Sequence, residues 1–149
     1  MSFSKNFIWG AASAAYQLEG AYKEDGKGLN IWDVYSRIPG NVHCTETGDI
    51  ACDHYHRYKE DIELFKKTGI KYYRFSISWT RIMPQGTGKV NEKGIKYYSD
   101  LVDSLIEAGI EPMVTLFHWD YPYELYRQGG WMNDQSPAWF EEYIRVVVD

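Results

Sequence analysis

Two stretches of the sequence repeat one plan: Thr68–Trp79 reads TGIKYYRFSISW and Ala108–Trp119 reads AGIEPMVTLFHW. In both, a glycine is followed by a run rich in apolar and aromatic residues, which is typical of a strand, and the run ends at a tryptophan. An apolar stripe with helical spacing precedes each glycine, and a glycine just past such a stripe commonly ends a helix. The sequence therefore predicts a repeated unit of helix, glycine and strand, with a tryptophan in the following loop.

The two helices of this unit are predicted over His54–Thr68, with Asp53 as N-cap, and from Asn91 as N-cap to the second glycine. Their apolar stripes consist of Tyr55, Tyr58, Ile62 and Phe65 in the first helix and Ile95, Tyr98, Val102 and Leu105 in the second. Strands are expected over Lys71–Ser78 and Glu111–His118. Because the strands alternate with helices, we expect a parallel sheet with helical crossovers.

The flanking segments continue this alternation. Phe7–Ala15 is expected to form a first strand, and Ala138–Asp149 begins a third helix, with Ser136 as its N-cap and Pro137 at its first position. Gln17–Cys52 is rich in glycine and polar residues and is expected to be a long loop. A loop of that length in a compact domain is usually functional or mobile.

Three strands, two complete helices and the start of a third predict an α/β fold. A doubly wound domain of about five strands contains such units, and so does a (β/α)8 TIM barrel, which needs about 250 residues. The long loops after the strands favour the barrel. Residues 1–149 are thus predicted to be the N-terminal fragment of a single TIM-barrel domain, about three βα units that do not close the barrel by themselves. The last residues carry no cap, glycine or polar tail, so we expect a cut chain.

The composition limits the classes of partner. The net charge is −5, with basic residues scattered along the chain, which argues against nucleic acid and against an anionic membrane. No apolar run reaches the length of a membrane span or of a secretory signal. Two cysteines are too few for a disulfide framework, so we expect a reducing, cytoplasmic location. The aromatic content of 17% has two interpretations, a ring-rich core or rings that bind sugar.

Polar residues stand where the predicted strands end. In a barrel the chemistry lies at the carboxyl ends of the strands, which would give His118, Trp119 and Asp120 a functional place. Gln17 and Glu19 follow the first strand and could reach the same face. Each has a structural alternative: a hydrogen-bonding histidine, a tryptophan lid on the barrel, and an aspartate that starts a turn.

Arg74 lies within the second predicted strand, with no acidic residue close in sequence as an obvious partner. Because an inward guanidinium without a carboxylate is costly to bury, this position suggests a partner from elsewhere in the fold.

A metal site is the other possibility that the sequence raises, at His43, Cys44, Cys52, His54 and His56. The spacing of the two cysteines matches no common zinc pattern. His54 and His56 stand two residues apart on a helix and therefore point to different sides. No phosphate-binding or dinucleotide-binding glycine motif occurs either. We expect neither a metal nor an organic cofactor.

Several long motifs carry a resemblance. They are FIWGAASAAYQLEGA from Phe7, GLNIWDVYS from Gly28, GDIACDHYHRYKEDIELFKKTGIKYYRFSISWTRI from Gly48, and TLFHWDYPYEL from Thr115, followed by GGW. In order and spacing, these motifs resemble glycoside hydrolase family 1, the β-glucosidase family. The resemblance runs from about Phe7 to the end of the chain and implies a (β/α)8 barrel that hydrolyses β-linked glycosides with retention of configuration.

The resemblance also implies roles for particular residues. Gln17 would bind hydroxyls on the far side of the glycone, the sugar whose bond is cut. His118 and Trp119 would line the same subsite. Arg74 would hold the catalytic nucleophile in place. These roles would make the four residues the glycone-binding and nucleophile-positioning groups of the enzyme.

The catalytic carboxylates of the family are missing from the 149 residues. Retaining glycosidases use a pair about 5–5.5 Å apart, which the family supplies from Asn-Glu-Pro and Thr-Glu-Asn-Gly motifs, and neither motif occurs here. Asp120 and Glu124 have neither role in the family. We expect a fragment of a retaining β-glucosidase that acts on terminal β-D-glucosides or short β-linked oligosaccharides, with β-galactosides as a second class. The fragment would be inactive without a companion polypeptide carrying the remaining strands. The alternative is a non-catalytic assembly fragment or a sugar-binding module.

Overall fold

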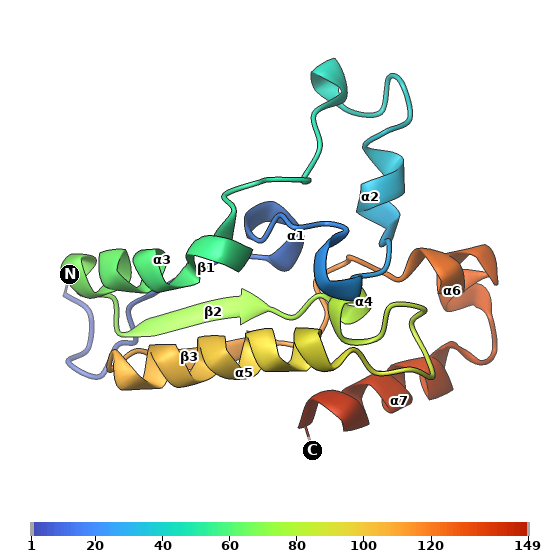
Figure 1. Ribbon diagram of the computed structural model, residues 1–149. Coiled ribbons are helices and arrows are strands. Elements are labelled where there is room, and N and C mark those ends of the chain that lie inside the picture. The colour runs from blue at the N-terminus through green and yellow to red at the C-terminus, as the bar shows by residue number, and fades with distance from the viewer. Residues whose placement is uncertain (1, 149) are drawn as a thin grey trace.

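The structure, a computed structural model that describes residues 2–148, contains one parallel three-stranded sheet (Figure 1). Its strands are β1 (Gly10–Ala12), β2 (Tyr72–Ser76) and β3 (Glu111–Thr115), in the order β1-β2-β3. Within the sheet Arg74 of β2 is paired with Ala12 on one side and Met113 on the other. The predicted parallel sheet is confirmed, although each strand is shorter than expected.

Two long helices connect the strands. Helix α3 (His54–Thr68) has the predicted bounds, and α5 (Glu92–Glu107) starts directly after Asn91. Both pack on the side of β2 that carries Tyr73 and Phe75. A third helix, α7 (Ser136–Val148), follows β3, and it begins at the serine that was expected to cap it.

The predicted N-caps have the right positions but not the capping bonds. Asp53 adopts a left-handed conformation with φ of 57°, and its carboxylate lies 2.6 Å from Nδ1 of His56 instead of accepting from the first turn of α3. Asn91 makes no capping bond either, because its side-chain amide donates to the carbonyl oxygens of Asp25 and Arg81, both at 2.9 Å. A side-chain contact within the first turn thus replaces the capping bond at α3, and tertiary bonds replace it at α5.

Short helices occupy the segments that follow the strands. After β1 come α1 (Ala15–Leu18), η1 (Glu24–Gly26), α2 (Ile31–Tyr35) and η2 (His43–Thr45); after β2 comes α4 (Trp79–Ile82); after β3 come α6 (Tyr123–Arg127) and η3 (Gly130–Met132). The prediction of a plain loop over Gln17–Cys52 was therefore wrong. Helices of four or five residues leave no periodic stripe that sequence analysis could detect. The segment between α2 and α3 extends away from the sheet, toward the top of Figure 1.

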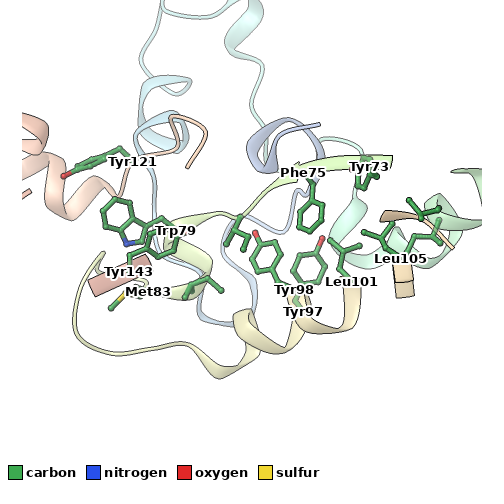
Figure 2. Close-up of a cluster of buried hydrophobic side chains, with 14 of the residues drawn as sticks. Tyr73, Phe75, Trp79, Met83, Tyr97, Tyr98, Leu101, Leu105, Tyr121 and Tyr143 are labelled. Atoms are coloured by element: carbon green, nitrogen blue, oxygen red, sulfur yellow. The ribbon is translucent and has the colours of Figure 1, made fainter. Parts of the chain in front are cut away.

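The core lies between β2 and the helices (Figure 2). Tyr73 and Phe75 of β2 pack there with Leu101 and Leu105 of α5, all four nearly inaccessible to solvent. A second aromatic group surrounds the fully buried Trp79, whose ring stacks on that of Tyr143 with centroids 4.8 Å apart; other rings packed against Trp79 are Phe117, Tyr121, Trp131 and Phe140. Many of the aromatic residues thus belong to the core.

The sheet has two free edges within residues 2–148, because β1 and β3 each pair with β2 alone. Met113 and Val114 of β3 are nearly half exposed. Beside β3 lies an apolar hollow of about 460 Å³, lined mainly by Ile77, Ile95, Val102, Val114, Leu116, Val146 and Val147. The described part of the chain is therefore an open sheet with apolar surface at one edge. No helix in this part is both long and apolar enough to cross a membrane.

Candidate active site

Three segments meet at the carboxyl ends of the strands. Backbone bonds join them: Gly28 N–H donates to the carbonyl of Thr80 at 3.0 Å, and Ile31 N–H donates to the carbonyl of Tyr121 at 2.9 Å. Asn30 also forms an isolated antiparallel bridge with Pro122. The segment after β1 thus ties together those after β2 and β3. Since the carboxyl ends of parallel strands lie together, these segments cover one end of the sheet. Ligands bind at this end in parallel α/β folds.

Arg74 lies on the sheet face opposite the helices. Its neighbours Tyr73 and Phe75 are buried in the core, so the alternation of a strand turns Arg74 to the other side, where it is half-buried. Its guanidinium Nη1 donates to the Thr115 hydroxyl at 3.4 Å, and it forms no ion pair with any carboxylate among residues 2–148. Most hydrogen-bond donors of the Arg74 guanidinium therefore have no partner among residues 2–148.

His118 and Trp119 lie shortly after β3, with Leu116 and Phe117 between the strand and His118. Trp119 has φ of 75° and leaves its side chain 67% exposed. A left-handed backbone is costly for a bulky residue and persists only where the surroundings impose it. His118 is half-buried, with Nδ1 enclosed and without a hydrogen-bond partner in the described residues. The turn thus presents an indole to the open side and keeps the imidazole partly enclosed beside it.

Asp120 comes next and is 1% exposed. Neither carboxylate oxygen has a hydrogen-bond partner among residues 2–148. Burial raises the pKa of Asp120 to about 6, opposed first by its own nearby backbone N–H; the charge of Glu19 raises the pKa further, and the nearby Lys27 and Ser78 hydroxyl lower it slightly. The acid group of Asp120 is thus enclosed inside the protein, unlike the exposed indole of Trp119 directly before it.

Gln17 is carried by α1 and is exposed to solvent. Its amide group makes no hydrogen bond within the described residues, whereas its backbone N–H donates to Ala14 at 3.1 Å. The Gln17 side chain is therefore exposed and unbonded within residues 2–148, on the helix that follows β1.

Glu19 does not reach this face, and the expectation that it could was wrong. It is 4% exposed, with Oε2 accepting from Nε of Arg81 at 2.9 Å and Oε1 accepting from the Tyr98 hydroxyl at 2.5 Å. Both oxygens are occupied inside the protein, so Glu19 is a structural anchor. Its arginine was missed by sequence analysis, although a charge directly before Ile82 and Met83 in a short apolar helix was a usable signal.

A second buried ion pair lies in the segment after β1. Lys27 Nζ is 3.0 Å from Oδ2 of Asp33, and both side chains are almost completely buried. Asp33 also forms a capping box with Asn30, since each side chain accepts the other residue's backbone N–H at 2.9 Å. These bonds stabilise the start of α2, the element next to the bridge at Pro122.

Two of the histidines considered for a metal site have carboxylate partners. His54 is buried, with Nδ1 2.5 Å from Oδ2 of Asp61, and the exposed His56 lies between Asp53 and Glu24. Cys44 and Cys52 are exposed free thiols. Within residues 2–148 no three histidine, cysteine, aspartate or glutamate side chains come together in a way that could hold a metal ion.

Comparison with known proteins gives consistent matches over the chain. The family model described as Glycosyl hydrolase family 1 matches residues 1–149. Beta-glucosidase A of Acetivibrio thermocellus is 57% identical over 147 residues, which is 99% of this chain and 33% of that protein. An aryl-phospho-β-D-glucosidase of Bacillus subtilis is 53% identical over 135 residues, covering 91% of this chain and 28% of that protein.

Solved structures show the same likeness. A family 1 β-glucosidase from Thermotoga maritima superposes with a TM-score of 0.95 at 54% identity, over 97% of this chain and 33% of that one. The same enzyme in complex with glucoimidazole gives a TM-score of 0.95 as well. The chain spans about a third of the length of these relatives. Its open sheet is the N-terminal part of a (β/α)8 barrel, as the sequence predicted, and the chain belongs to glycosyl hydrolase family 1.

Proposed function

We propose that the protein containing this chain is a retaining β-glucosidase, and that residues 1–149 supply the glycone-binding part of a single barrel domain. The observation that carries this proposal is the half-buried Arg74, which has no carboxylate partner among residues 2–148. Its strand is paired with the two strands that are followed by Gln17 and by His118 and Trp119. The 57% identity to a β-glucosidase makes a glucoside the first substrate to consider.

Binding at this face follows from the chemistry of the side chains. The Gln17 amide and the His118 imidazole can exchange hydrogen bonds with sugar hydroxyls. The exposed indole of Trp119 offers a flat apolar face to the C–H groups of a pyranose. We assign Gln17 to the hydroxyls on the far side of the glycone and His118 and Trp119 to the wall of the same subsite. A β-glucoside or a short β-linked oligosaccharide would place its terminal sugar here.

Bond cleavage needs two further carboxyl groups from the rest of the barrel. One protonates the leaving oxygen and later activates water; the other attacks the anomeric carbon and forms a covalent glycosyl-enzyme. Arg74 would pair with the second group, because a guanidinium nearby favours its ionised, nucleophilic form. The chemistry requires neither a metal nor an organic cofactor. The remaining strands would come from a longer chain or from a companion polypeptide, so the 149 residues alone would be inactive.

Substrate preference within the family is part of the proposal. The relatives include both a β-glucosidase and an aryl-phospho-β-D-glucosidase, so this third of the barrel is similar in enzymes with either kind of name. We assign terminal β-D-glucosides as the main substrates, β-galactosides as a second class, and the cytoplasm as the location.

The test compares p-nitrophenyl β-D-glucoside with its 6-phospho derivative as substrates of the complete protein. A higher kcat/KM on the unphosphorylated substrate supports the proposal. A preference for the phosphorylated one would correct the substrate class, and no hydrolysis of either would reject the enzyme.

The second candidate is an assembly fragment without activity of its own, which the free edges of β1 and β3 and the apolar hollow beside β3 favour. It would be aggregated or poorly structured until its complement is added. A sugar-binding module, by contrast, would be monomeric and would bind glucose by itself.

A further inference from the structure

We propose that Arg81 and Tyr98 are positioning residues of the glycone site, which act through Glu19 to hold α1 and thereby Gln17 in place. This inference rests on the proposed function, and it assigns a role to three buried residues that do not lie on the binding face themselves.

The contacts of Glu19 form a closed set inside the protein. Its two carboxylate oxygens accept from Arg81 Nε at 2.9 Å and from the Tyr98 hydroxyl at 2.5 Å. The same hydroxyl accepts the backbone N–H of Ser78 at 2.7 Å. Arg81 also donates from Nη2 to the carbonyl of Gly20 at 3.2 Å. The end of α1 is thus joined to α4, to α5 and, through the Tyr98 hydroxyl, to Ser78 between β2 and α4.

Helix α1 needs such anchors because it has only four residues. A helix that short is not stable by itself and takes its position from its contacts. At its start, the Ala15 N–H donates to the Ser76 hydroxyl at 2.8 Å. At its end, the carbonyl of Leu18 accepts from Cys52 N–H at 3.2 Å, and Glu19 makes the bonds described above. Gln17 lies between these two anchors, with no side-chain bond of its own in the described residues.

The ion pair suits a positional role better than a stabilising one. Side chains of Arg81 and Glu19 are 1% and 6% exposed, so both charges have lost most of their hydration. Replacing such a pair by apolar residues is often neutral or stabilising, while the pair itself fixes one geometry. The guanidinium also lies over the Tyr55 ring, 4.2 Å from its centroid, which restrains it from another direction. Arg81 is therefore held from several sides and can fix Glu19 in a single orientation.

The experiment is a double-mutant cycle in the complete protein, with Gln17→Ala, Arg81→Met and the two combined. The substrates are an aryl β-glucoside and its 4-deoxy analogue, which lacks a hydroxyl on the far side of the sugar. If Arg81 acts through Gln17, each single variant lowers kcat/KM on the glucoside by about 10-fold or more and lowers it much less on the analogue. The double variant is then no worse than the poorer single variant, because both changes remove the same interaction.

Two further variants make the test specific. Tyr98→Phe removes only the hydroxyl that bonds Glu19, so it should shift the ratio between the two substrates in the same direction but less, and it serves if Arg81→Met does not fold. Arg57→Met is the matched control, since Arg57 is an exposed arginine paired with Glu60 on α3. Arg57→Met should leave kcat/KM on both substrates unchanged. The melting temperatures of all variants report separately on stability.

The possible outcomes are distinguishable. The positioning role is overturned if the variants lose kcat/KM equally on both substrates. It is also overturned if the effects of Arg81→Met and Gln17→Ala multiply in the double variant. The β-glucosidase proposal stands in both cases. Unchanged kinetics in Gln17→Ala also overturn it, because no interaction would remain to be positioned. Inactivity of the unmodified complete protein toward β-glucosides instead rejects the proposed function, and the inference falls with it.

Discussion

Arg74 brings a positive charge to the open face of the sheet, with only the Thr115 hydroxyl beside it among the described residues. If it positions and ionises a nucleophilic carboxylate, Arg74→Ala in the complete protein should lower kcat by about 100-fold or more, the usual scale for losing a key electrostatic group. Steady-state kinetics on an aryl β-glucoside measure this. Arg74→Lys keeps the charge but loses the paired N–H donors of the guanidinium. Its kcat should therefore lie between those of the alanine variant and the unmodified protein. Near-normal turnover in the alanine variant would contradict the role.

Asp120 predicts a pH effect on stability. Its pKa is raised from 3.8 to about 6 by burial, so the folded state favours the neutral acid. Protonated Asp120 therefore contributes to the free energy of unfolding. This contribution is complete below the pKa of the unfolded state, and it is lost as the pH rises through about 6, which lowers the free energy of unfolding by about 3 kcal/mol. In urea unfolding of the complete protein, Asp120→Asn should therefore become more stable relative to the unmodified protein between pH 4 and pH 7.5.

The matched control for this change is Asp134→Asn, at an exposed position. Its difference in unfolding free energy from the unmodified protein should stay nearly constant over the same pH range. A constant difference for Asp120→Asn as well would mean that Asp120 titrates at its ordinary pKa in the complete protein.

Single residues were predictable where the backbone determines their place. The place of Arg74 within β2 and of His118 and Trp119 shortly after β3 could be predicted, because runs of apolar residues mark strands in the sequence. The direction of the Glu19 side chain could not be predicted, since it depends on Arg81 and Tyr98 from other elements, which no local pattern connects to it. The burial of Asp120 could not be predicted either, because it comes from tertiary packing.

At the scale of elements, α5 approaches α4 closely at Gly94. A Cβ built on Gly94 would lie 2.0 Å from the backbone oxygen of Arg81, which cannot move aside as a side chain could. Gly94→Ala should therefore destabilise the complete protein by about 1–3 kcal/mol, although alanine normally stabilises a helix interior by about 1 kcal/mol relative to glycine. Thermal unfolding measures the change.

Ser99→Ala is the control, on the same helix but at an exposed position. It should leave the melting temperature unchanged or raise it slightly, because alanine has the better helix propensity. A Gly94→Ala variant as stable as this control would show that the close approach of the two helices does not exist in solution.

Long elements could be predicted and short ones could not. The apolar stripes of α3 and α5 run over about four helical turns, and a stripe of that length and spacing fits only a helix. For this reason α3 was predicted with its observed bounds. In contrast, α1, α2, α4 and α6 span four or five residues each and are held by tertiary bonds such as that from Ala15 to Ser76. The elements that carry or support the site therefore belong mostly to the class that sequence patterns do not reveal.

At the scale of the whole molecule, the described part is an open three-stranded sheet with a free edge on each side. The chain spans about a third of the length of its relatives, which are β-glucosidases. Arg74 and the side chains that we propose to bind the glycone are present, whereas the two catalytic motifs of the family are absent from the 149 residues. Under the proposed function, residues 1–149 therefore bind the sugar, and carboxyl groups from the rest of the barrel cleave the bond.

The most direct test of this separation is hydrolysis of an aryl β-glucoside by the purified 149-residue chain alone and after addition of a polypeptide that supplies the remaining strands. The account predicts no activity for the chain alone and activity in the mixture. Activity of the chain alone would contradict it, and Asp120, Glu124 and Glu19 would then be the first carboxyl groups to replace.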